Sequence, residues 1–160
     1  MLRRRPLDPD SDYTGMVEAQ RKSWEINFPD DYFSESIFCA SVRSAARRGE
    51  VFVYELEGGD GSVAVIAWLW LDLGRPRAAV HIRHIQVAQE HWGKGFGRQI
   101  MEDVMALAVA RGARALTLNV TKSNARAMNL YESLGFEVKE DSGSRQKMCL
   151  ALDLDDDSGV

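Results

Sequence analysis

The stretch from residue 81 to residue 107 constrains this chain most, because three local patterns follow one another within it. Apolar residues that end near Val87 predict a strand, three glycines between residues 93 and 97 predict a tight loop, and apolar residues at helical spacing then predict a long helix. A glycine-rich loop that leads into a helix presents several backbone N–H groups in one direction. Because this arrangement suits a phosphate group, the sequence predicts a phosphate-binding loop.

Two common phosphate loops fail on spacing. The P-loop of nucleotide hydrolases requires a glycine five positions before Gly-Lys and a serine or threonine after it, but this chain has Ala88 there and Gly95 after Lys94. A dinucleotide fingerprint that starts at Gly93 would have Arg98 at its third glycine. The loop therefore belongs to another class of phosphate site.

Composition limits the classes of protein. The 160 residues are 45% hydrophobic and 28% charged, which is typical of one globular domain over residues 1–160. The net charge of −4 argues against a nucleic-acid partner, which normally requires a basic face. No apolar run approaches the length of a membrane span, so no membrane partner is expected. The acidic tail, about 154–160, is expected to be disordered.

The basic start and the cysteines indicate a compartment. Arginines at positions 3–5 are followed by Pro6 and Asp8, where a signal peptide would be apolar, so we expect a cytoplasmic protein. Cys39 and Cys149 have no metal-ligand or redox spacing, which predicts two buried, reduced thiols, with one disulfide as the alternative, and no metal site. A monomer or a homodimer is expected.

Hydrophobic periodicity predicts strands and helices in the order β-α-α-β-β-β-α-β-α-β-β, which is the α/β (α+β) class. Helices are expected from Asp10 or Ser11 to Glu25, from Ser34 to Arg48, from the glycine loop to Gly112, and from Asn124 to Leu134. Strands are expected over 2–5, 51–56, 63–73, 79–88, 115–120, 136–140 and 147–152. The second helix is expected to bury one stripe, which comprises Ile37, Phe38, Val42 and Ala45.

Residues 85–101, IQV-AQEH-WGKGFG-RQIM, resemble the acetyl-coenzyme A signature of the GNAT superfamily of N-acetyltransferases. That signature is an apolar-x-Val triplet at a strand end, then Gln/Arg-x-x-Gly-x-Gly/Ala at the start of a long helix. Gly95 and Gly97 fall on its two small positions, whereas Trp92 stands where glutamine or arginine is usual. The departure preserves the backbone amides but puts one side-chain contact in question.

Residues 116–138 resemble a second signature of the same family, Asn-x-x-Ala-x-x-x-Tyr-x-x-x-Gly-Phe. The residues on its positions are Asn124, Ala127, Tyr131, Gly135 and Phe136. The resemblance covers nearly the whole chain, although the first fifty residues match only in element order. It implies a single domain with a mixed, mostly antiparallel, seven-stranded sheet flanked by about four helices. That sheet would splay at the strands that end near Val87 and Val120.

The resemblance also implies a cosubstrate, acetyl-CoA, and no metal. The pyrophosphate of acetyl-CoA would bind the loop amides, and its pantetheine arm would pair with the edge of the strand that ends at Val87. One amide of that edge would stabilise the oxyanion. The residues expected to bind the cofactor are Ile85, Gln86, Val87, Trp92, Gly93, Lys94, Gly95, Phe96, Gly97, Arg98, Asn124, Ala127 and Tyr131.

Acetyl transfer to an amine requires a proton donor for the leaving thiolate and an acceptor for the proton of the ammonium group. The resemblance assigns the donor role to Tyr131, for which the alternative is a core tyrosine that packs its helix. Many relatives carry a glutamate as base on the strand before the loop, at the position of His81. An imidazole titrates near 6.5 and can accept a proton. His84 and a water relay are the alternatives to His81.

The family recognises its acceptor through the first two helices and their connecting loop. Trp24, Phe28 and Tyr32 cluster there and could hold a cationic or aromatic amine, or pack a helix–sheet seam. The expected activity is direct acetyl transfer, in a ternary complex, to a primary amine of a small molecule or peptide. The alternatives are a protein N-terminal or lysine acetyltransferase and a non-catalytic acyl-CoA-binding module. Asn119 replaces the catalytic glutamate of ribosomal-protein N-terminal acetyltransferases, which argues against that activity.

Overall fold

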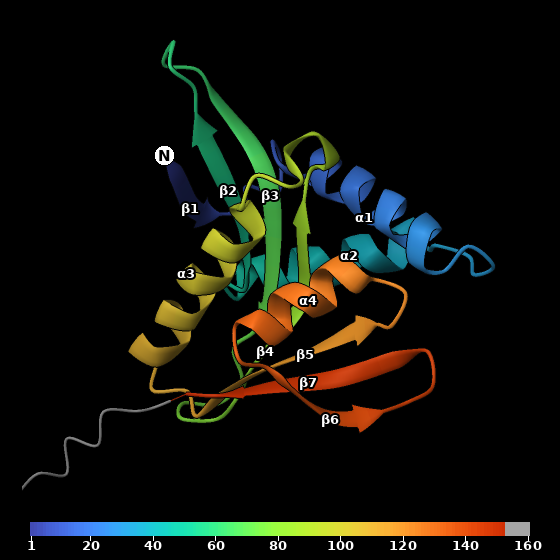
Figure 1. Ribbon diagram of the computed structural model, residues 1–160. Helices are drawn as coiled ribbons and strands as arrows, with labels where there is room; N and C mark the ends of the chain where they lie inside the picture. The colour runs from blue at the N-terminus through green and yellow to red at the C-terminus, as the bar shows by residue number, and fades with distance from the viewer. Residues whose placement is uncertain (153–160) are drawn as a thin grey trace, which may run out of the picture. The chain divides into compact units, whose positions relative to one another are not determined.

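A computed structural model describes residues 1–152, which form seven strands and four α-helices in the predicted order (Figure 1). These residues belong to two compact units. Unit 1 comprises residues 1–71 and 84–94, and unit 2 comprises residues 72–83 and the chain from residue 95 onward. The division falls inside one strand, between Arg83 and His84. The tail predicted at 154–160 lies outside the described residues, and the single domain over 1–160 stays a prediction.

Unit 1 pairs its strands antiparallel, β1 with β2 and β2 with β3. The amide of Ala88, just after β4, donates to the carbonyl of Ile66 on β3 at 2.8 Å. A turn at residues 58–61 joins β2 to β3, with Gly61 at a φ of +81°. The elements of unit 1 are β1 (Leu2–Pro6), α1 (Tyr13–Asn27), α2 (Glu35–Arg47), β2 (Val51–Glu57), β3 (Val63–Asp72, as far as Leu71), the second half of β4 (Val80–Val87) and a 3-10 turn, η1 (Gln89–His91).

Unit 2 contains the first half of β4, which pairs parallel with β5, and an antiparallel group in the order β5-β7-β6. Its other elements are α3 (Phe96–Ala110), β5 (Ala115–Thr121), α4 (Ala125–Ser133), β6 (Glu137–Asp141) and β7 (Arg145–Ala151). The predicted mixed, mostly antiparallel sheet of seven strands is thereby confirmed. The parallel ladder covers three residue pairs, from Val80 with Leu116 to Ile82 with Leu118, and both strands continue past it. The splay near Val87 and Val120 stays a prediction.

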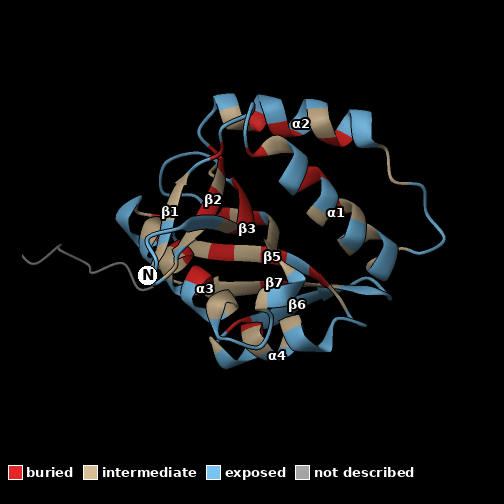
Figure 2. Cartoon of the chain, turned by 90° about the horizontal axis from the view of Figure 1, so that it is seen from above, coloured by how far each residue is buried: buried red, intermediate tan, exposed pale blue. Residues whose placement is uncertain are grey.

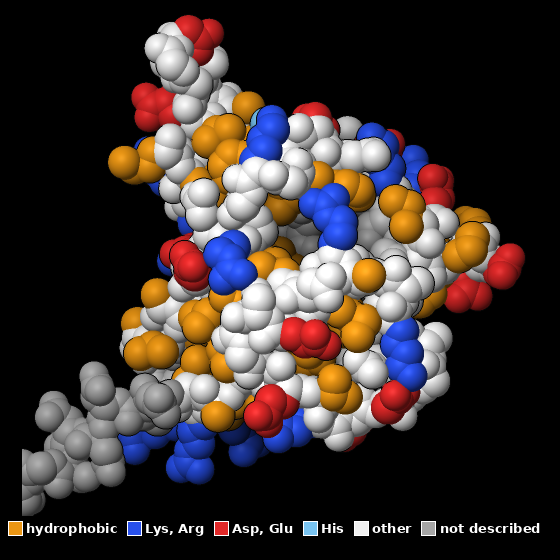
Figure 3. All heavy atoms as spheres, viewed as in Figure 1, with side chains coloured by type: hydrophobic (Ala, Val, Ile, Leu, Met, Phe, Trp, Pro, Cys, Tyr) orange, Lys and Arg blue, Asp and Glu red, His pale blue; other side chains and the backbone are white. Residues whose placement is uncertain are grey.

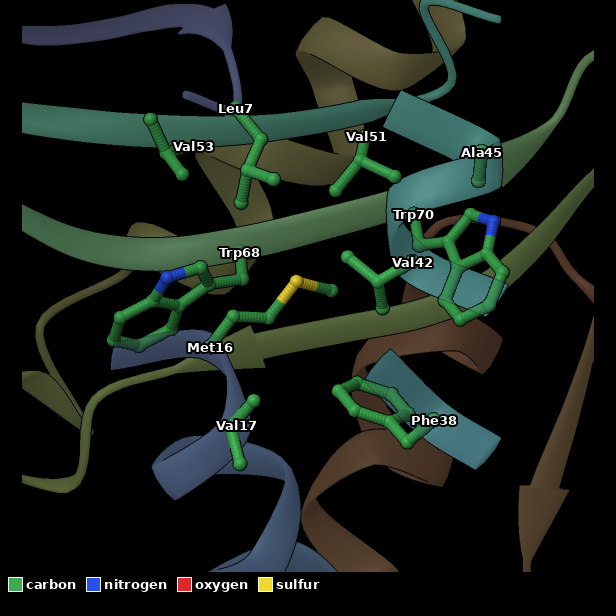
Figure 4. Packing of buried hydrophobic residues seen from close by; sticks show 10 residues of the cluster. All are labelled: Leu7, Met16, Val17, Phe38, Val42, Ala45, Val51, Val53, Trp68 and Trp70. Carbon is green, nitrogen blue, oxygen red and sulfur yellow. The ribbon is translucent and has the colours of Figure 1, made fainter. Parts of the chain in front are cut away.

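The core of unit 1 lies between its two helices and the strands β2 and β3 (Figure 4). Burying each of its larger apolar side chains contributes about 1.5–3 kcal/mol. Its members are Leu7, Met16, Val17, Phe38, Val42, Ala45, Val51, Val53, Trp68 and Trp70. Ile37 is not among them, because it is 69% exposed. The prediction that Ile37 shares the buried stripe was wrong, since the stripe follows positions 38, 42 and 45 and residue 37 lies about 100° away around the helix.

Phe38 and Ile37, which are neighbours in α2, give a matched test of this core. We expect Phe38→Ala to lower the free energy of unfolding by about 3–5 kcal/mol, because it leaves a cavity in the centre of unit 1. Ile37→Ala shortens an apolar side chain on the exposed face of the helix. It should therefore change the free energy of unfolding by less than about 0.5 kcal/mol. Urea unfolding followed by circular dichroism measures both. Equal losses in the two variants would contradict the packing described for α2.

The start of α1 is fixed by an ion pair. The N-cap is Asp12 rather than Asp10 or Ser11, so the helix begins at Tyr13, and Asp12 makes no side-chain capping bond. The Asp12 carboxylate instead accepts two hydrogen bonds from the Arg5 guanidinium, at 2.6 and 2.9 Å, and one from the amide of Asp8. The Arg5 bonds outweigh burial and hold the pKa of Asp12 below its usual range. Arg5 of β1 therefore anchors the first helix.

Helices α3 and α4 of unit 2 lie on the same face of β5 and β7 (Figures 1 and 2). The buried residues of α3 are Ile100, Met101, Val104 and Ala108. They recur at helical spacing, as predicted, whereas Phe96 and Leu107 of the same helix are only half-buried. A Cβ added at Gly97 would lie 3.3 Å from Cδ2 of Leu130, so this glycine lets α3 approach α4 closely.

The surface and the cysteines agree with the composition. Acidic and basic side chains both occur among hydrophobic ones on the face in Figure 3. Cys39 and Cys149 are free, as predicted, although each is half-buried. Within residues 1–152, no helix combines the length and the apolar character that crossing a membrane requires.

Candidate active site

The glycine loop follows β4 and η1, and two of its glycines have backbone angles that other residues rarely adopt. Gly93 has a φ of +74° and Gly95 a φ of +83°. A Cβ at either position would meet no described atom within 4 Å. Their requirement for glycine is therefore conformational, and the space beside the backbone is open. Gly97 differs, because its small size serves the packing of α3 on α4.

The N-terminus of α3 has no side-chain cap. Gly95 is the N-cap residue and the first turn has no acidic residue. By contrast, the hydroxyl of Ser34 caps α2 and the side chain of Asn124 caps α4. The amides of Phe96 and the two residues after it thus start a fifteen-residue helix whose dipole favours an anion. This is the backbone arrangement predicted from the glycine spacing.

Trp92 closes the turn between β4 and the loop. Its indole N–H donates to the carbonyl of Val87 at 2.7 Å, while the ring is 44% exposed. The residue that departs from the family signature thus holds the strand end itself. Lys94 is exposed beside it. The guanidinium of Arg98, a predicted cofactor ligand in unit 2, donates to the hydroxyl of Ser133 at 2.6 Å.

Side chains near the end of β4 contact residues of unit 1 on one face of the strand. Gln86 donates from its side-chain amide to Oε1 of Gln20 on α1, and Gln20 is 6% exposed. The ring of His84 lies 5.9 Å from that of Phe38 and 5.3 Å from that of Trp70. Sequence reasoning missed Gln20, although its place one turn after buried Met16 is a signal that could have found it.

His81 belongs to unit 2 and is bound to the neighbouring strand. Its Nδ1 lies 2.7 Å from Oγ1 of Thr117, and the two residues are partners in the β4–β5 ladder. Burial, with a smaller contribution from the charge of Arg83, lowers the pKa of His81 below 6.5. The neutral imidazole, which can accept a proton, is therefore the form at neutral pH. Thr117 was not predicted, since its place opposite His81 depends on the strand register.

The lowered pKa of His81 has a consequence for stability. Between the folded and unfolded pKa values the unfolded chain binds more protons, so folding stability falls as the pH drops below about 6.5. We expect the urea midpoint of the wild type to fall more between pH 7.5 and pH 5.5 than that of His81→Gln, which cannot titrate there. A wild-type midpoint that falls no further than the variant's would contradict the buried neutral state of His81.

The second motif places a capped helix before a buried phenol. Oδ1 of Asn124 accepts from the amide of Ala127 at 3.2 Å, which leaves the Nδ2 amide as a donor for a ligand. Two turns further, Tyr131 is 7% exposed, and its ring lies 5.7 Å from that of Phe136. Burial raises the pKa of Tyr131 to about 12, so the phenol stays protonated at any working pH.

The three predicted acceptor contacts have different surroundings in unit 1. Trp24 lies 4.9 Å from Phe28 and 5.8 Å from Phe33, measured between ring centroids, and its indole N–H donates to the carbonyl of Asp31 at 3.1 Å. These half-buried rings therefore pack one another. Tyr32 is 89% exposed. It is the member of the three with most surface left for a ligand.

Comparison with known proteins gives matches in sequence and in fold. Residues 13–136 match the model of the acetyltransferase (GNAT) family. The chain is 38% identical to streptothricin acetyltransferase of Streptomyces lavendulae over 109 residues, 68% of this chain and 54% of that protein. It is 31% identical to the 5-NmdU N-acetyltransferase of Pseudomonas phage PaMx11 over 118 residues, 74% of this chain and 77% of that protein. The chain thus spans about half the length of the first of these relatives.

A solved structure shares the fold. The PaiA N-acetyltransferase of Thermoplasma acidophilum, solved in complex with coenzyme A, superposes with a TM-score of 0.72 over 94% of this chain and 99% of that one. The sequence identity is 16%.

Proposed function

We propose an activity for this chain from one premise: the chain belongs to the acetyltransferase (GNAT) family. It transfers the acetyl group of acetyl-CoA to a primary amine of a small molecule or a peptide. The observation that carries this proposal is the uncapped N-terminus of α3, preceded by Gly95 in the left-handed region. The relative named for streptothricin supports a small-molecule acceptor.

Acetyl-CoA binds through main-chain groups. The amides of the loop and of the first turn of α3 receive the pyrophosphate, because they lie at the positive end of a helix dipole that has no side-chain cap. Alternate backbone N–H and C=O groups of the segment from Ile85 to Val87 pair with the pantetheine arm as an added strand would. Lys94 adds a positive charge, and Asn124 donates from Nδ2. Trp92, Phe96, Arg98 and Ala127 shape the surrounding surface.

The reaction is direct attack of the free amine on the thioester carbonyl. The nitrogen–carbon bond forms, the carbon–sulfur bond breaks, the sulfur leaves as a thiolate, and the new amide nitrogen releases its extra proton to solvent. Full proton transfer from Tyr131 would be uphill by about 5 kcal/mol, because its pKa of about 12 exceeds the thiol value of about 8.5. Tyr131 therefore acts mainly by donating a hydrogen bond to the sulfur as negative charge develops there, and the protonation of the thiolate is completed from solvent.

The ammonium form of the acceptor must lose a proton before it attacks. His81 accepts that proton, directly or through water, since its neutral form is favoured by burial. His84 and a water relay without a dedicated base remain the alternatives. His81→Gln and His84→Gln separate them in one pH–rate experiment. If the acidic limb of the pH–rate profile disappears in one variant alone, the histidine replaced in that variant is the base. If the limb persists in both variants, the water relay is supported.

The acceptor binds beside the aromatic cluster of Trp24 and Phe28, with Tyr32 as an exposed contact. Aromatic faces attract cationic amines, and the net charge of −4 does not oppose them. A protein N-terminal or lysine acetyltransferase is the alternative within the family. A non-catalytic acyl-CoA-binding module is the alternative outside it.

The decisive experiment has two arms. Titration calorimetry with acetyl-CoA tests cofactor binding, and release of free thiol over a panel of small amines, peptides with free N-termini and lysine peptides tests transfer. Acceptor-dependent thiol release would support the enzyme and identify its acceptor class. Binding without turnover across the whole panel would favour the binding module, and the absence of acetyl-CoA binding would overturn both.

A further inference from the structure

The end of β4 carries a polar pair that the family resemblance did not predict. The side-chain amide of Gln86 donates to Oε1 of Gln20 on α1, and both residues belong to unit 1. Gln20 is 6% exposed and follows Met16 and Val17 on the buried side of its helix. A buried amide on an otherwise apolar face is unfavourable unless a partner satisfies it. Gln86 is that partner.

The pair is one of several contacts that hold this strand end. Alternate residues of a strand point to the same face, so His84 and Gln86 face the helices of unit 1 together. The ring of His84 packs against Phe38 and Trp70, whereas Gln86 reaches α1. Just beyond, the indole of Trp92 holds the carbonyl of Val87. The hydrogen bond from Gln86 is directional, so it resists rotation of the strand about its own axis.

We propose that Gln20 is a positioning residue for acetyl-CoA, which acts by fixing the side chain of Gln86. When the side chain of Gln86 is fixed, the two peptide groups on either side of Gln86 are held in one direction. Those groups belong to the edge, Ile85 to Val87, that binds the pantetheine arm, so this inference rests on the proposed function. A strand edge that is already ordered binds its ligand more tightly than an edge that must become ordered on binding.

Methionine variants separate positioning from packing. Methionine has nearly the shape of glutamine but does not donate a hydrogen bond. The double variant Gln20→Met with Gln86→Met replaces both partners with apolar side chains, so its urea midpoint should return close to the wild-type value. Its affinity for coenzyme A should be reduced about 10-fold, since no directional hydrogen bond holds the side chain at position 86. Affinity that recovers with stability would show a purely structural role.

Failure of this inference is distinguishable from failure of the proposed function. If the wild type does not bind acetyl-CoA, the proposed function fails before any variant is made. If the wild type binds acetyl-CoA and the glutamine variants bind it equally well, only the positioning role of Gln20 is overturned.

Discussion

Replacing Tyr131 with phenylalanine is expected to lower kcat for amine acetylation about 100-fold. The variant keeps the buried ring and its contact with Phe136 but loses the donor to the leaving sulfur. Because that interaction develops as the thioester bond breaks, the KM for acetyl-CoA should stay within about threefold of the wild-type value. Thiol release under saturating acetyl-CoA measures kcat. Because the pKa of Tyr131 is about 12, its ionisation should produce no limb in the pH–rate profile below about pH 10.

Tyr54→Phe provides the matched control for this variant. Tyr54 is also a buried tyrosine, 2% exposed, but it lies on β2 in unit 1, outside the proposed site. Its kcat should stay close to the wild-type value, and urea unfolding of both variants checks that each is folded. A folded Tyr131→Phe variant with unchanged kcat would show that Tyr131 only packs its helix, the alternative that the sequence left open.

Gly95→Ala is expected to weaken acetyl-CoA binding about 10- to 100-fold. A methyl group disfavours the φ of +83° and turns the first amides of α3 away from a pyrophosphate. Each hydrogen bond to a charged group contributes about 1.5–3 kcal/mol, so losing one accounts for the whole expected change in Kd. Titration calorimetry with acetyl-CoA measures it.

Gly49→Ala separates backbone strain from ligand binding. Gly49 has a φ of +73°, and a Cβ there would also meet no described atom within 4 Å, but it follows α2 in unit 1 and lies outside the proposed site. Both alanine variants should lose about 1–2 kcal/mol of folding stability through the left-handed backbone. Only Gly95→Ala should lose affinity. Equal affinities in the two variants would rule out the loop amides as the pyrophosphate site.

Patterns within one segment predicted the elements of this fold and the local form of the site. Apolar periodicity gave the strands and helices to within a few residues, and glycine spacing gave the uncapped start of α3. Asn124, the first residue of the helix expected over 124–134, is its N-cap and accepts through Oδ1, which leaves Nδ2 as a donor. Each of these features depends on residues within one or two turns, for which sequence spacing is a sufficient guide.

Features that depend on a distant partner were missed. The start of α1 moved because Arg5, on another element, takes the carboxylate of Asp12. Gln20 meets a residue 66 positions away, and Thr117 meets His81 only through the strand register. Ile37 was misplaced for a different reason, since one helical position separates the centre of an apolar stripe from its exposed flank. Periodicity gives the face of an element but does not identify its partner.

The division of β4 between the two units affects how the chain can fold during synthesis. Unit 1 needs residues 84–94 as well as 1–71, so it lacks its last strand until the ribosome has made residue 94 and more. Unit 2 starts at residue 72 but is interrupted by those same residues. Neither unit is a contiguous piece of chain that a single cut could release intact. Neither unit can therefore complete its folding during synthesis until most of the chain has emerged from the ribosome.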